Sequence, residues 1–323
     1  MKNITVLVLE GVMDSSLAIT LDVLQAARRL SSSASGAPRI RIETIAASAK
    51  VSTASGLCLA VDTTLKNAVP GSPASQWIIV PGLGLMSDEA VASRFARPDA
   101  IKAIGWLRNA AMGKASIAAS CTGVFLLAEG GLLAGRRATT TWWLGQAFRA
   151  RYPDVVLDDT RMLVRDGKYL TAGAALSQLD VMLAVVTDVM GASIAHLCSR
   201  YMLIDKRSSQ ARYMMREHLL HQDPTVIAAE RWIDAHLAQP ISVNALASEL
   251  AVSSKTLARR IASATGISPI RFIQRRRLGQ AVHLIETTTL SIEEVAAQVG
   301  YVDSTALRKL IKREFGVTPS MLR

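Results

Sequence analysis

The chain has 323 residues, of which half are hydrophobic and a fifth are charged, and its net charge at pH 7 is +11. This composition is typical of a globular protein with a substantial core, and it excludes an intrinsically disordered chain. No run of 18 uncharged apolar residues is present, so the sequence predicts neither a transmembrane helix nor a membrane partner. The length allows two domains.

Basic residues are concentrated in the C-terminal part. Residues 196–323 hold 18 Lys and Arg against 11 Asp and Glu, whereas residues 1–195 hold 19 against 15. This excess favours a polyanionic partner, with a merely solvated basic face as the alternative. The cysteines Cys58, Cys121 and Cys198 are odd in number and widely spaced, which fits neither a disulfide framework nor a metal site. We therefore expect a cytoplasmic protein with no metal and no cofactor.

Strands and helices are expected to alternate along the first two thirds of the chain. The apolar run at residues 3–9 indicates a buried strand, and Glu10 and Asp14 interrupt it too early for a signal peptide. Further strands are expected at residues 39–47, 57–61, 77–84 and 115–120, and shorter ones between 135 and 171. Helices are expected over residues 14–30, 88–112 with a break at Pro98, 122–130, 142–151, 175–190 and 193–204. This alternation predicts an α/β sandwich with helices on both faces of a parallel sheet.

Cys121 stands where a buried strand is expected to meet a helix. Such a turn projects one side chain above the sheet, and the helix N-terminus lowers the pKa of a thiol there, which suits a nucleophile. The alternative is a small cysteine that only packs. Catalysis would also need a base close to the thiol, but all five histidines lie at position 196 or beyond.

A polar stretch over residues 205–223 is predicted to be a linker between a first domain, 1–204, and a second domain, 224–323. The second domain is expected to open with a helix over residues 225–238, because Pro224 suits a first helical turn. The buried side of this helix is predicted to consist of Ile227, Trp232, Ile233 and Leu237.

Two segments of the second domain, 241–261 and 291–316, repeat one pattern of helix, tight turn and capped basic helix. Ser254 is expected to cap the second helix of the first copy, and Asp303 or Ser304 that of the second copy, where Gly300 lies in the turn. The inward-facing residues are predicted to be Leu246, Ala247, Leu250, Leu257 and Ile261 in the first copy, and Ile292, Val295 and Ala296 in the second. This layout is that of a DNA-reading helix-turn-helix, so we predict an all-α domain with two such motifs.

The C-terminal sequence resembles the DNA-binding domain of AraC/XylS-type transcription regulators. Residues 225–323 carry this resemblance through ALASELAVSSKTLARRI, ATGISPIRFIQRRRL and IEEVAAQVGYVDSTALRKLIKREFGVTPSMLR. Ala306-Leu307 departs from the family pattern, which has an aromatic pair or Ser-Phe at this place.

The N-terminal sequence resembles a PfpI-like domain of the class I glutamine amidotransferase superfamily. Residues 1–204 carry it through VPGLG, SIAASCTGVFLLAEGGLLAGRRATTTWW and YLTAGAALSQLDVML. The resemblance implies a flavodoxin-like, amidotransferase-like sheet. The two domains in this order are similar to GlxA-type regulators, in which the amidotransferase-like fold is a sensor.

The N-terminal domain departs from its catalytic relatives at two positions. Ser16 stands where family enzymes hold a glutamate, and Thr141 stands where related chains hold a histidine. We therefore expect a ligand pocket rather than an active site. Its predicted lining is Asp14, Ser16, Gly82, Leu83, Cys121, Thr122, Thr141 and Trp142. Similar regulators respond to amino acids or quaternary amines, and the indole of Trp142 would suit a cationic head group unless it only packs.

The resemblance also implies that one helix over residues 269–287 connects the two motifs. At about 1.5 Å per residue it would span roughly 28 Å, comparable with the roughly 34 Å between successive major-groove faces. The predicted DNA contacts are Lys255, Thr256, Ala258, Arg259, Ser304, Thr305, Arg308 and Lys309, with Arg260, Arg271 and Lys312 nearer to phosphates. Arg275, Arg276 and Arg277 are expected to form a solvated or phosphate-near face.

The two resemblances together imply a transcription regulator that binds promoter DNA and acts on RNA polymerase, with an amidotransferase-like domain that binds a small effector and mediates homodimerisation. The resemblance implies activation, with repression as the alternative. A second hypothesis is a thiol-dependent hydrolase or deglycase fused to a DNA-binding domain. A third is a redox sensor that uses oxidation of Cys121.

Overall fold

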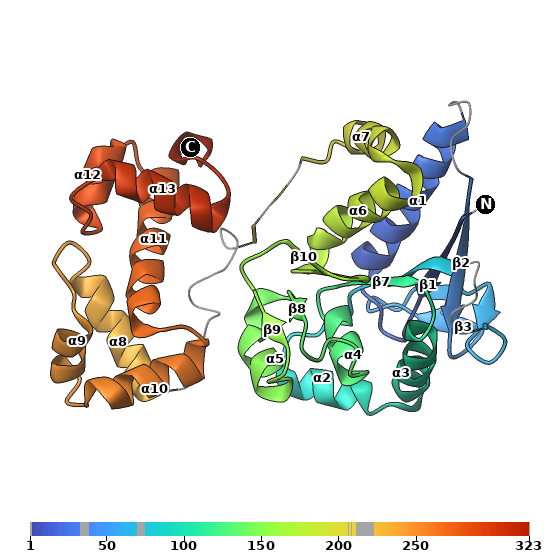
Figure 1. Ribbon diagram of the computed structural model, residues 1–323, viewed down its shortest axis with the longest axis horizontal. Helices are drawn as coiled ribbons and strands as arrows, with labels where there is room; N and C mark the ends of the chain where they lie inside the picture. Colours follow the sequence, from blue (N-terminus) through green and yellow to red (C-terminus); the bar gives the residue numbers. More distant parts are fainter. Residues whose placement is uncertain are drawn as a thin grey trace. The chain divides into compact units, whose positions relative to one another are not determined.

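The computed structural model describes residues 2–32, 39–69, 75–205, 207, 209–210 and 223–322 (Figure 1). The chain divides into two compact units, Met1–Gln210 and Ala211–Arg323. Of the predicted linker, residues 206, 208 and 211–222 lie outside the described residues. Within the described parts of the chain, no helix combines the length and the apolar character that crossing a bilayer requires.

A mostly parallel sheet forms the centre of the first unit. Its strands are β1 (Lys2–Leu7), β2 (Ile40–Ala46), β5 (Thr63–Thr64), β6 (Ser75–Val80), β7 (Ser116–Ser120), β10 (Leu163–Asp166) and β11 (Tyr169–Ala172). They lie in the order β10-β11-β7-β6-β1-β2-β5, and among these described strands only β10 runs antiparallel to its neighbour. Two small pairs lie outside this sheet, β3 (Lys50–Ser52) with β4 (Cys58–Ala60) and β8 (Arg137–Ala138) with β9 (Val156–Leu157).

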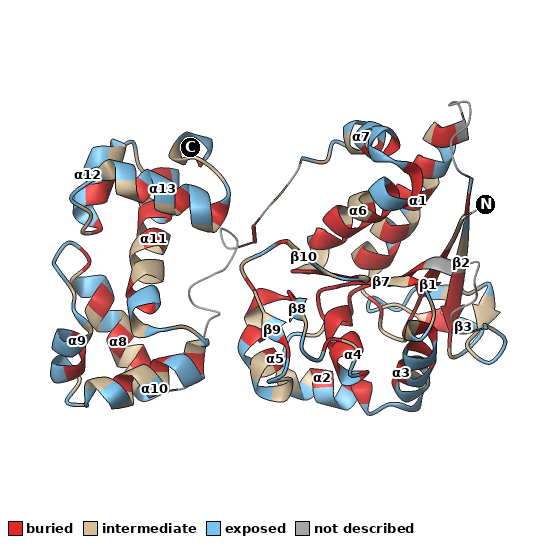
Figure 2. Ribbon diagram, in the orientation of Figure 1, coloured by how far each residue is buried: buried red, intermediate tan, exposed pale blue. Residues whose placement is uncertain are grey.

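Helices cover both faces of the sheet (Figure 1). One face carries α1 (Asp14–Ser32), α6 (Gln178–Met190) and α7 (Ala192–Tyr201), and the other carries α2 (Asp88–Phe95), α3 (Pro98–Ala111), α4 (Gly123–Glu129) and α5 (Gly145–Arg151). Because both faces are covered, the central strands are buried along most of their length, as Figure 2 shows. This burial explains why their sequences are continuous apolar runs. The predicted α/β sandwich is confirmed. The last helix is shorter than predicted, because it ends at Tyr201 instead of residue 204.

The second unit consists of helices. They are α8 (Pro224–Ala235), α9 (Val243–Glu249), α10 (Ser254–Thr265), α11 (Pro269–Thr287), α12 (Ile292–Gln298) and α13 (Ser304–Phe315), followed by a short 3-10 turn, η5 (Pro319–Met321). The long helix α11 runs between two groups of helices (Figure 1) and has the bounds predicted for the connecting helix. Its first half packs with α8, α9 and α10, and its second half packs with α12 and α13, so that each group has a core of its own.

Two details of this unit differ from the sequence prediction. The cap of α10 is Ser253, whose hydroxyl accepts from the backbone amide of Thr256, and Ser254 is the first helical residue instead of the cap. The buried stripe of α8 is formed by Val226, Ala229 and Ile233 together with Leu237. Ile227 and Trp232 instead line a surface hollow, because they lie on the neighbouring face of the helix.

Candidate functional site

Each helix-turn-helix motif bends through a residue with left-handed backbone conformation. In the first motif this residue is Ala251, with φ of 52°, and in the second it is Gly300, with φ of 79°. A Cβ at position 300 would overlap the carbonyl oxygen of Leu237 and lie 2.9 Å from the Arg277 guanidinium. The glycine is therefore required both by its conformation and by the close approach of the chain before α9.

The second helix of each motif is fixed at its start by the same device. Asp303 caps α13 through the backbone amide of Thr305, as Ser253 caps α10. The next residue reaches back to the first helix: Ser254 Oγ donates to Asn244 Oδ1 at 2.7 Å, and Ser304 Oγ donates to Glu293 Oε1 at 3.1 Å. In both motifs the start of the second helix is thus hydrogen-bonded to the first turn of the first helix.

The inner face of each recognition helix is apolar and fully buried. Leu257 and Ile261 anchor α10, and Leu307 and Ile311 occupy the same places on α13. Burying each side chain contributes about 1.5–3 kcal/mol. Ala306-Leu307, which departs from the family pattern, thus still supplies a buried anchor. The opposite face of each helix is left to solvent, as Figure 2 shows for α10 and α13.

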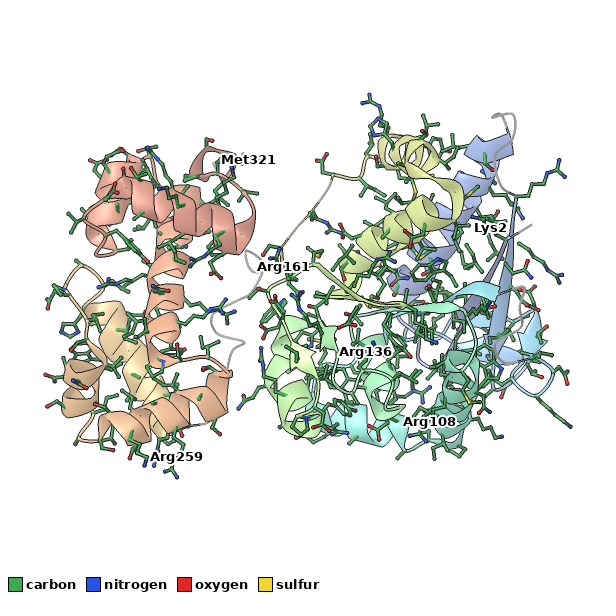
Figure 3. The ribbon with its side chains drawn as sticks, viewed as in Figure 1. Lys2, Arg108, Arg136, Arg161, Arg259 and Met321 are labelled. Carbon is green, nitrogen blue, oxygen red and sulfur yellow. The ribbon has the colours of Figure 1, made fainter. Side chains whose placement is uncertain are left out.

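All the predicted DNA contacts except Arg271, which lies on α11, belong to these two helices. Lys255, Arg259, Arg271, Thr305, Arg308, Lys309 and Lys312 are exposed, and Thr256, Ala258, Arg260 and Ser304 are half-buried. Arg259 points outward from α10 (Figure 3) and makes no ion pair with any residue that the structure describes. Arg308 is 50% exposed and pairs with Glu293 at 3.0 Å. Its charge is thus partly neutralised until a stronger anion replaces that carboxylate.

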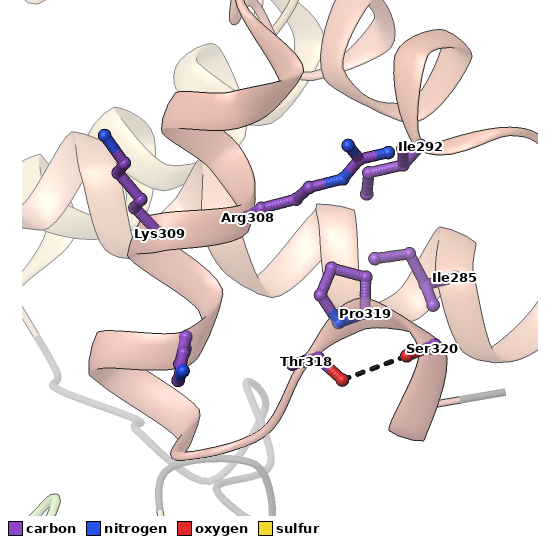
Figure 4. A pocket seen from close by; sticks show the side chains of 8 residues that line it. Ile285, Ile292, Arg308, Lys309, Thr318, Pro319 and Ser320 are labelled. Atoms are coloured by element: carbon purple, nitrogen blue, oxygen red, sulfur yellow. Dashed lines mark hydrogen bonds between the residues drawn. The ribbon is translucent and has the colours of Figure 1, made fainter.

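A groove of about 560 Å³ runs beside α13. Its lining consists of Ile285, Ile292, Arg308, Lys309, Lys312, Thr318, Pro319 and Ser320. Figure 4 shows Arg308 lying along this groove toward Ile292. Three cationic side chains over an apolar floor suit a polyanion whose sugar or base edges enter the groove.

The two arginines predicted near phosphates differ in their present partners. Arg260 donates to the hydroxyl of Thr225 at 2.7 Å and pairs with Asp223 at 3.4 Å, so it ties α10 to the start of α8. Arg271 is 54% exposed and lies 3.8 Å from Glu314. Arg271 is therefore the more available of the two for a phosphate.

The expectation that Arg276 and Arg277 form a solvated face is wrong. Arg276 is 13% exposed and pairs with both Glu230 and Asp234 of α8. Arg277 donates to the carbonyl oxygens of Gln239 and Gly300, at 2.5 and 3.2 Å. These guanidinium groups join α11 to its neighbours because carboxylates and turn carbonyls distant in sequence face them.

In the first unit, Cys121 occupies a strained turn between β7 and α4. Its φ is 51°, in the left-handed region that a residue with a side chain rarely adopts. The turn is held by the Cys121 backbone amide, which donates to the carbonyl of Gly173 at 2.7 Å. The predicted geometry of a residue projected from a strand–helix turn is therefore present.

The thiol itself differs from the prediction of a lowered pKa. Cys121 is 1% exposed, and burial raises the pKa of its thiol above the ordinary value of 9.0. Thr122, its backbone amide foremost, and the hydroxyl of Thr141 oppose this rise only in part. Desolvation outweighs them, because the charged thiolate loses its water in this interior.

Most of the predicted pocket residues do gather around this turn. Ser16 Oγ accepts from the backbone amide of Gly82 at 2.8 Å, and Thr122 Oγ1 exchanges hydrogen bonds with the backbone of Leu83. A Cβ added to Gly82 would lie 2.9 Å from the Cβ of Cys121. The loop after β6 and the start of α1 thus close over the cysteine.

Two hydroxyls in this cluster are buried without a hydrogen-bond partner among the described residues, those of Ser120 and Thr141. Both residues are fully buried. Thr141 lies near enough to Cys121 to lower its pKa, but its hydroxyl forms no full hydrogen bond to the thiol. Buried hydroxyls normally find partners, so these two groups mark a place where a polar ligand or water would be bound favourably.

Asp14 and Trp142 stand apart from the cluster. The carboxylate of Asp14 accepts from the hydroxyls of Thr53 and Ser55 at 2.5 and 2.7 Å, and these hydrogen bonds, that of Thr53 foremost, lower its pKa. It is therefore already engaged with the β3–β4 loop. Trp142 is buried and packs edge-to-face on Trp143, with ring centroids 5.5 Å apart.

The sequence analysis missed a buried polar group beside this turn. Gln210, the last residue of the first unit, places its side-chain amide against the backbone of Thr140 and Asp159. Thr140 in turn donates from Oγ1 to the carbonyl of Cys121 at 2.7 Å. The available signal in the sequence was the run of three threonines at 139–141. The structure buries all three fully.

Comparison with known proteins places both parts of the chain. Residues 2–188 match the model of the DJ-1/PfpI family, and residues 246–323 match the model of a helix-turn-helix domain. The first match spans more than half of the chain, so the chain belongs to the DJ-1/PfpI family. With its second match it has the domain composition of GlxA-type regulators of the AraC family.

Two curated relatives extend this comparison. The HTH-type transcriptional regulator ArgR of Pseudomonas aeruginosa is 26% identical over 216 residues, which cover 66% of this chain and 65% of that protein. The HTH-type transcriptional regulator GlxA of Rhizobium meliloti is 26% identical over 205 residues, covering 62% of this chain and 63% of that protein. The chain thus spans less than two thirds of the length of either relative.

Among solved structures, a THiJ/PfpI family protein from Pseudomonas syringae superposes with a TM-score of 0.51 and 20% identity. That match covers 64% of this chain and 76% of the other. At this identity the likeness concerns the fold.

Proposed function

We propose that this protein is a sequence-specific, DNA-binding transcription regulator whose DJ-1/PfpI unit senses a small molecule. The observation that carries the proposal is the pair of recognition helices, α10 and α13, with basic outer faces and matching caps on one helical unit. Both curated relatives are named transcriptional regulators. As in the sequence analysis, we propose a homodimer that acts in the cytoplasm on promoter DNA and RNA polymerase, with activation as the outcome.

In this proposal the exposed cations of the two recognition helices divide between bases and phosphates. Arg259, Arg308 and Lys309 enter the major groove, because guanidinium and ammonium groups are the commonest readers of guanine. Arg260 and Lys312 on these helices, and Arg271 at the start of α11, hold the register through phosphates, and Thr256 is a further DNA contact. The remaining base-facing residues are Lys255, Ala258, Ser304 and Thr305.

The effector would bind beside Cys121, at the carboxyl ends of the strands, where open parallel sheets bind ligands. The unpartnered hydroxyls of Ser120 and Thr141 support this place, because a ligand that bonds to them offsets their burial. An amino acid or a quaternary amine is the class of effector that we propose. Asp14 and Trp142 contribute to such a pocket only if they leave their present contacts.

The enzymatic and redox hypotheses both require an ionised, accessible thiol. Cys121 is buried with a raised pKa, and positions 16 and 141 supply hydroxyls where a carboxylate and an imidazole would be needed. The sensing function needs none of these groups. It therefore agrees better with the site than thiol chemistry does.

Footprinting of the purified full chain on genomic DNA, followed by affinity measurement on the site found, tests the DNA-binding function. Arg259→Ala should weaken binding to that site by about 1–3 kcal/mol and relax its sequence preference. Lys312→Ala should weaken binding to all sequences alike and lower the salt slope by about 1. Arg28→Ala, which removes an exposed charge of α1, is the charge-matched control.

Unchanged affinity of Arg259→Ala for the footprinted site would show that the role assigned to α10 is wrong. A thermal-shift screen of amino acids and quaternary amines on the same preparation then tests the sensor. Cysteine-dependent turnover of any of these compounds would instead favour the enzyme.

A further inference from the structure

A buried glutamine fills a polar recess at the end of the first unit. Gln210 is 1% exposed, and its Nε2 donates to the carbonyl oxygens of Thr140 and Asp159, both at 2.9 Å. Nε2 also lies 3.4 Å from the hydroxyl of Thr139. Its Oε1 accepts from the backbone amide of Ala174 at 3.0 Å. Three acceptors, the two carbonyls and the more distant Thr139 hydroxyl, and one donor thus surround the group, which is the complement of a primary carboxamide.

Gly173 makes room for this group. A Cβ at position 173 would overlap the side-chain oxygen of Gln210. The backbone of Gly173 does not lie in the left-handed region, so its conformation does not explain the glycine. The missing side chain instead leaves the space that the carboxamide occupies.

The recess adjoins the turn that carries Cys121. Thr140 accepts from Gln210 through its carbonyl and donates through its hydroxyl to the carbonyl of Cys121 at 2.7 Å. Gly173, on the other side, accepts from the amide of Cys121 at 2.7 Å. Thr140 lies just beyond the carboxyl end of strand β8, and Gly173 lies just beyond that of strand β11. The carboxamide of Gln210 is therefore linked through Thr140 to the backbone of the turn that carries Cys121.

The segment that bears Gln210 is attached by polar contacts. The amide of Gln210 and the hydroxyl of Ser209 both donate to the carbonyl of Thr160, at 3.0 and 2.9 Å. Arg207 pairs with Asp180 at 2.5 Å. Arg207, Ser209 and Gln210 are all polar, so they can leave without opening a hydrophobic core.

We propose that this recess is a recognition site for a primary carboxamide, which Gln210 occupies when no ligand is bound. A small effector that carries a carboxamide displaces Gln210 and releases Arg207, Ser209 and Gln210 from their contacts with the first unit. This inference rests on the proposed sensing function and narrows the class of effector. Because Gln210 is the last residue of the first unit, its release detaches the C-terminal end of that unit.

Hydrogen exchange on the wild-type full chain, with propionamide as the probe and propionate as its isosteric control, tests the recess. Propionamide should accelerate exchange of the Gln210 amide by about tenfold or more, because that amide loses Thr160 when the segment leaves. The Ala174 amide should stay protected, since the probe's carbonyl replaces Oε1. Propionate has no N–H for the two carbonyls and should change neither amide. The proposal would be overturned if neither probe accelerated exchange of the Gln210 amide, or if both accelerated it equally.

Variants test the competition between Gln210 and the probe. Gln210→Ala empties the recess and should bind propionamide about tenfold or more tightly than wild type, because the tethered competitor is gone. Gln210→Glu keeps the size but sets a carboxylate against two carbonyls, so exchange at Ala174 should accelerate. Gln146→Ala removes an exposed glutamine of α5 and should behave as wild type. Equal propionamide affinity in wild type and Gln210→Ala would refute the inference.

These experiments use no DNA. A negative result for the carboxamide site therefore does not contradict the DNA-binding function. Conversely, a chain that bound no DNA could still give the results expected for the carboxamide site. If Gln210→Ala does not fold, the wild-type exchange experiment decides by itself.

Discussion

Ser16 Oγ accepts a hydrogen bond from the backbone amide of Gly82 at 2.8 Å, and both residues are buried. This bond joins the start of α1 to the loop after β6, directly beside Cys121. In the catalytic proteins that this sequence resembles, a glutamate matches position 16. Here the position holds a short hydroxyl that fixes a loop, and it offers the thiol no carboxylate.

Replacing Ser16 with Ala should lower the free energy of unfolding by about 1–3 kcal/mol, because the buried amide of Gly82 loses its acceptor. Ser15→Ala is the matched control, since the hydroxyl of Ser15 is buried with no partner among the described residues. Its removal should leave stability unchanged or slightly raised. Urea unfolding measures both, and equal losses in the two variants would contradict this account of Ser16.

The three thiols should react at very different rates. Cys58 is exposed, whereas Cys121 and Cys198 are buried and burial raises the pKa of each above 9.0. At pH 8, fewer than about one in ten Cys121 thiols is then ionised. Titration of the native chain with a disulfide reagent should show one fast thiol, and Cys58→Ser should abolish that phase. A second fast thiol in Cys58→Ser, lost in Cys58→Ser/Cys121→Ser, would instead support a redox sensor.

Arg276 and Arg308 should separate stability from DNA affinity. Arg276→Ala leaves Glu230 and Asp234 without their shared partner and should destabilise the second unit by about 1–2 kcal/mol. Arg308→Ala removes an exposed pair with Glu293 and should change stability by less than about 0.5 kcal/mol while weakening DNA binding. Chemical denaturation and a binding isotherm on each variant check this. If Arg276→Ala weakened DNA binding and Arg308→Ala lowered stability, the structural role assigned to Arg276 and the DNA-binding role assigned to Arg308 would both be wrong.

The cap of α13 should titrate, whereas that of α10 should not. Hydrogen bonds from Thr305, its backbone amide foremost, hold the pKa of Asp303 below the ordinary 3.8. A lowered folded pKa means that the stabilisation is complete above 3.8 and is lost as the pH falls through the folded value. The amide NMR signal of Thr305 should therefore shift with a midpoint below 3.8. Thr256, which bonds to the uncharged Ser253, serves as the control, and a Thr305 midpoint at or above 3.8 would exclude the effect.

The helix-turn-helix unit was largely predictable because its signals are local. The apolar spacing that buries Leu257 and Ile261, the glycine in the second turn and the cap at Asp303 each act within a few residues. The one error at a cap, Ser254 in place of Ser253, is a shift of a single residue between two adjacent serines. Either serine could cap the helix, and only the path of the backbone in the turn determines which one does.

The roles of Arg276 and Gln210 could not be predicted from local patterns. The carboxylates that pair with Arg276 lie 42 and 46 residues away along the chain. The carbonyls that bind the Gln210 amide lie 51 and 70 residues away. A polar residue in a polar stretch of sequence is predicted to be exposed to solvent unless its partners elsewhere in the chain are known.

The amino-acid sequence by itself determined the alternation of strands and helices, the two recognition helices with their basic faces, and the presence of hydroxyl side chains at positions 16 and 141. These features depend on residue type and on spacing within one element. Only the tertiary structure decided that the Cys121 thiol is desolvated and that Gln210 closes a recess beside it. The physical reason is that burial and hydrogen bonding are set by neighbours from other strands and helices.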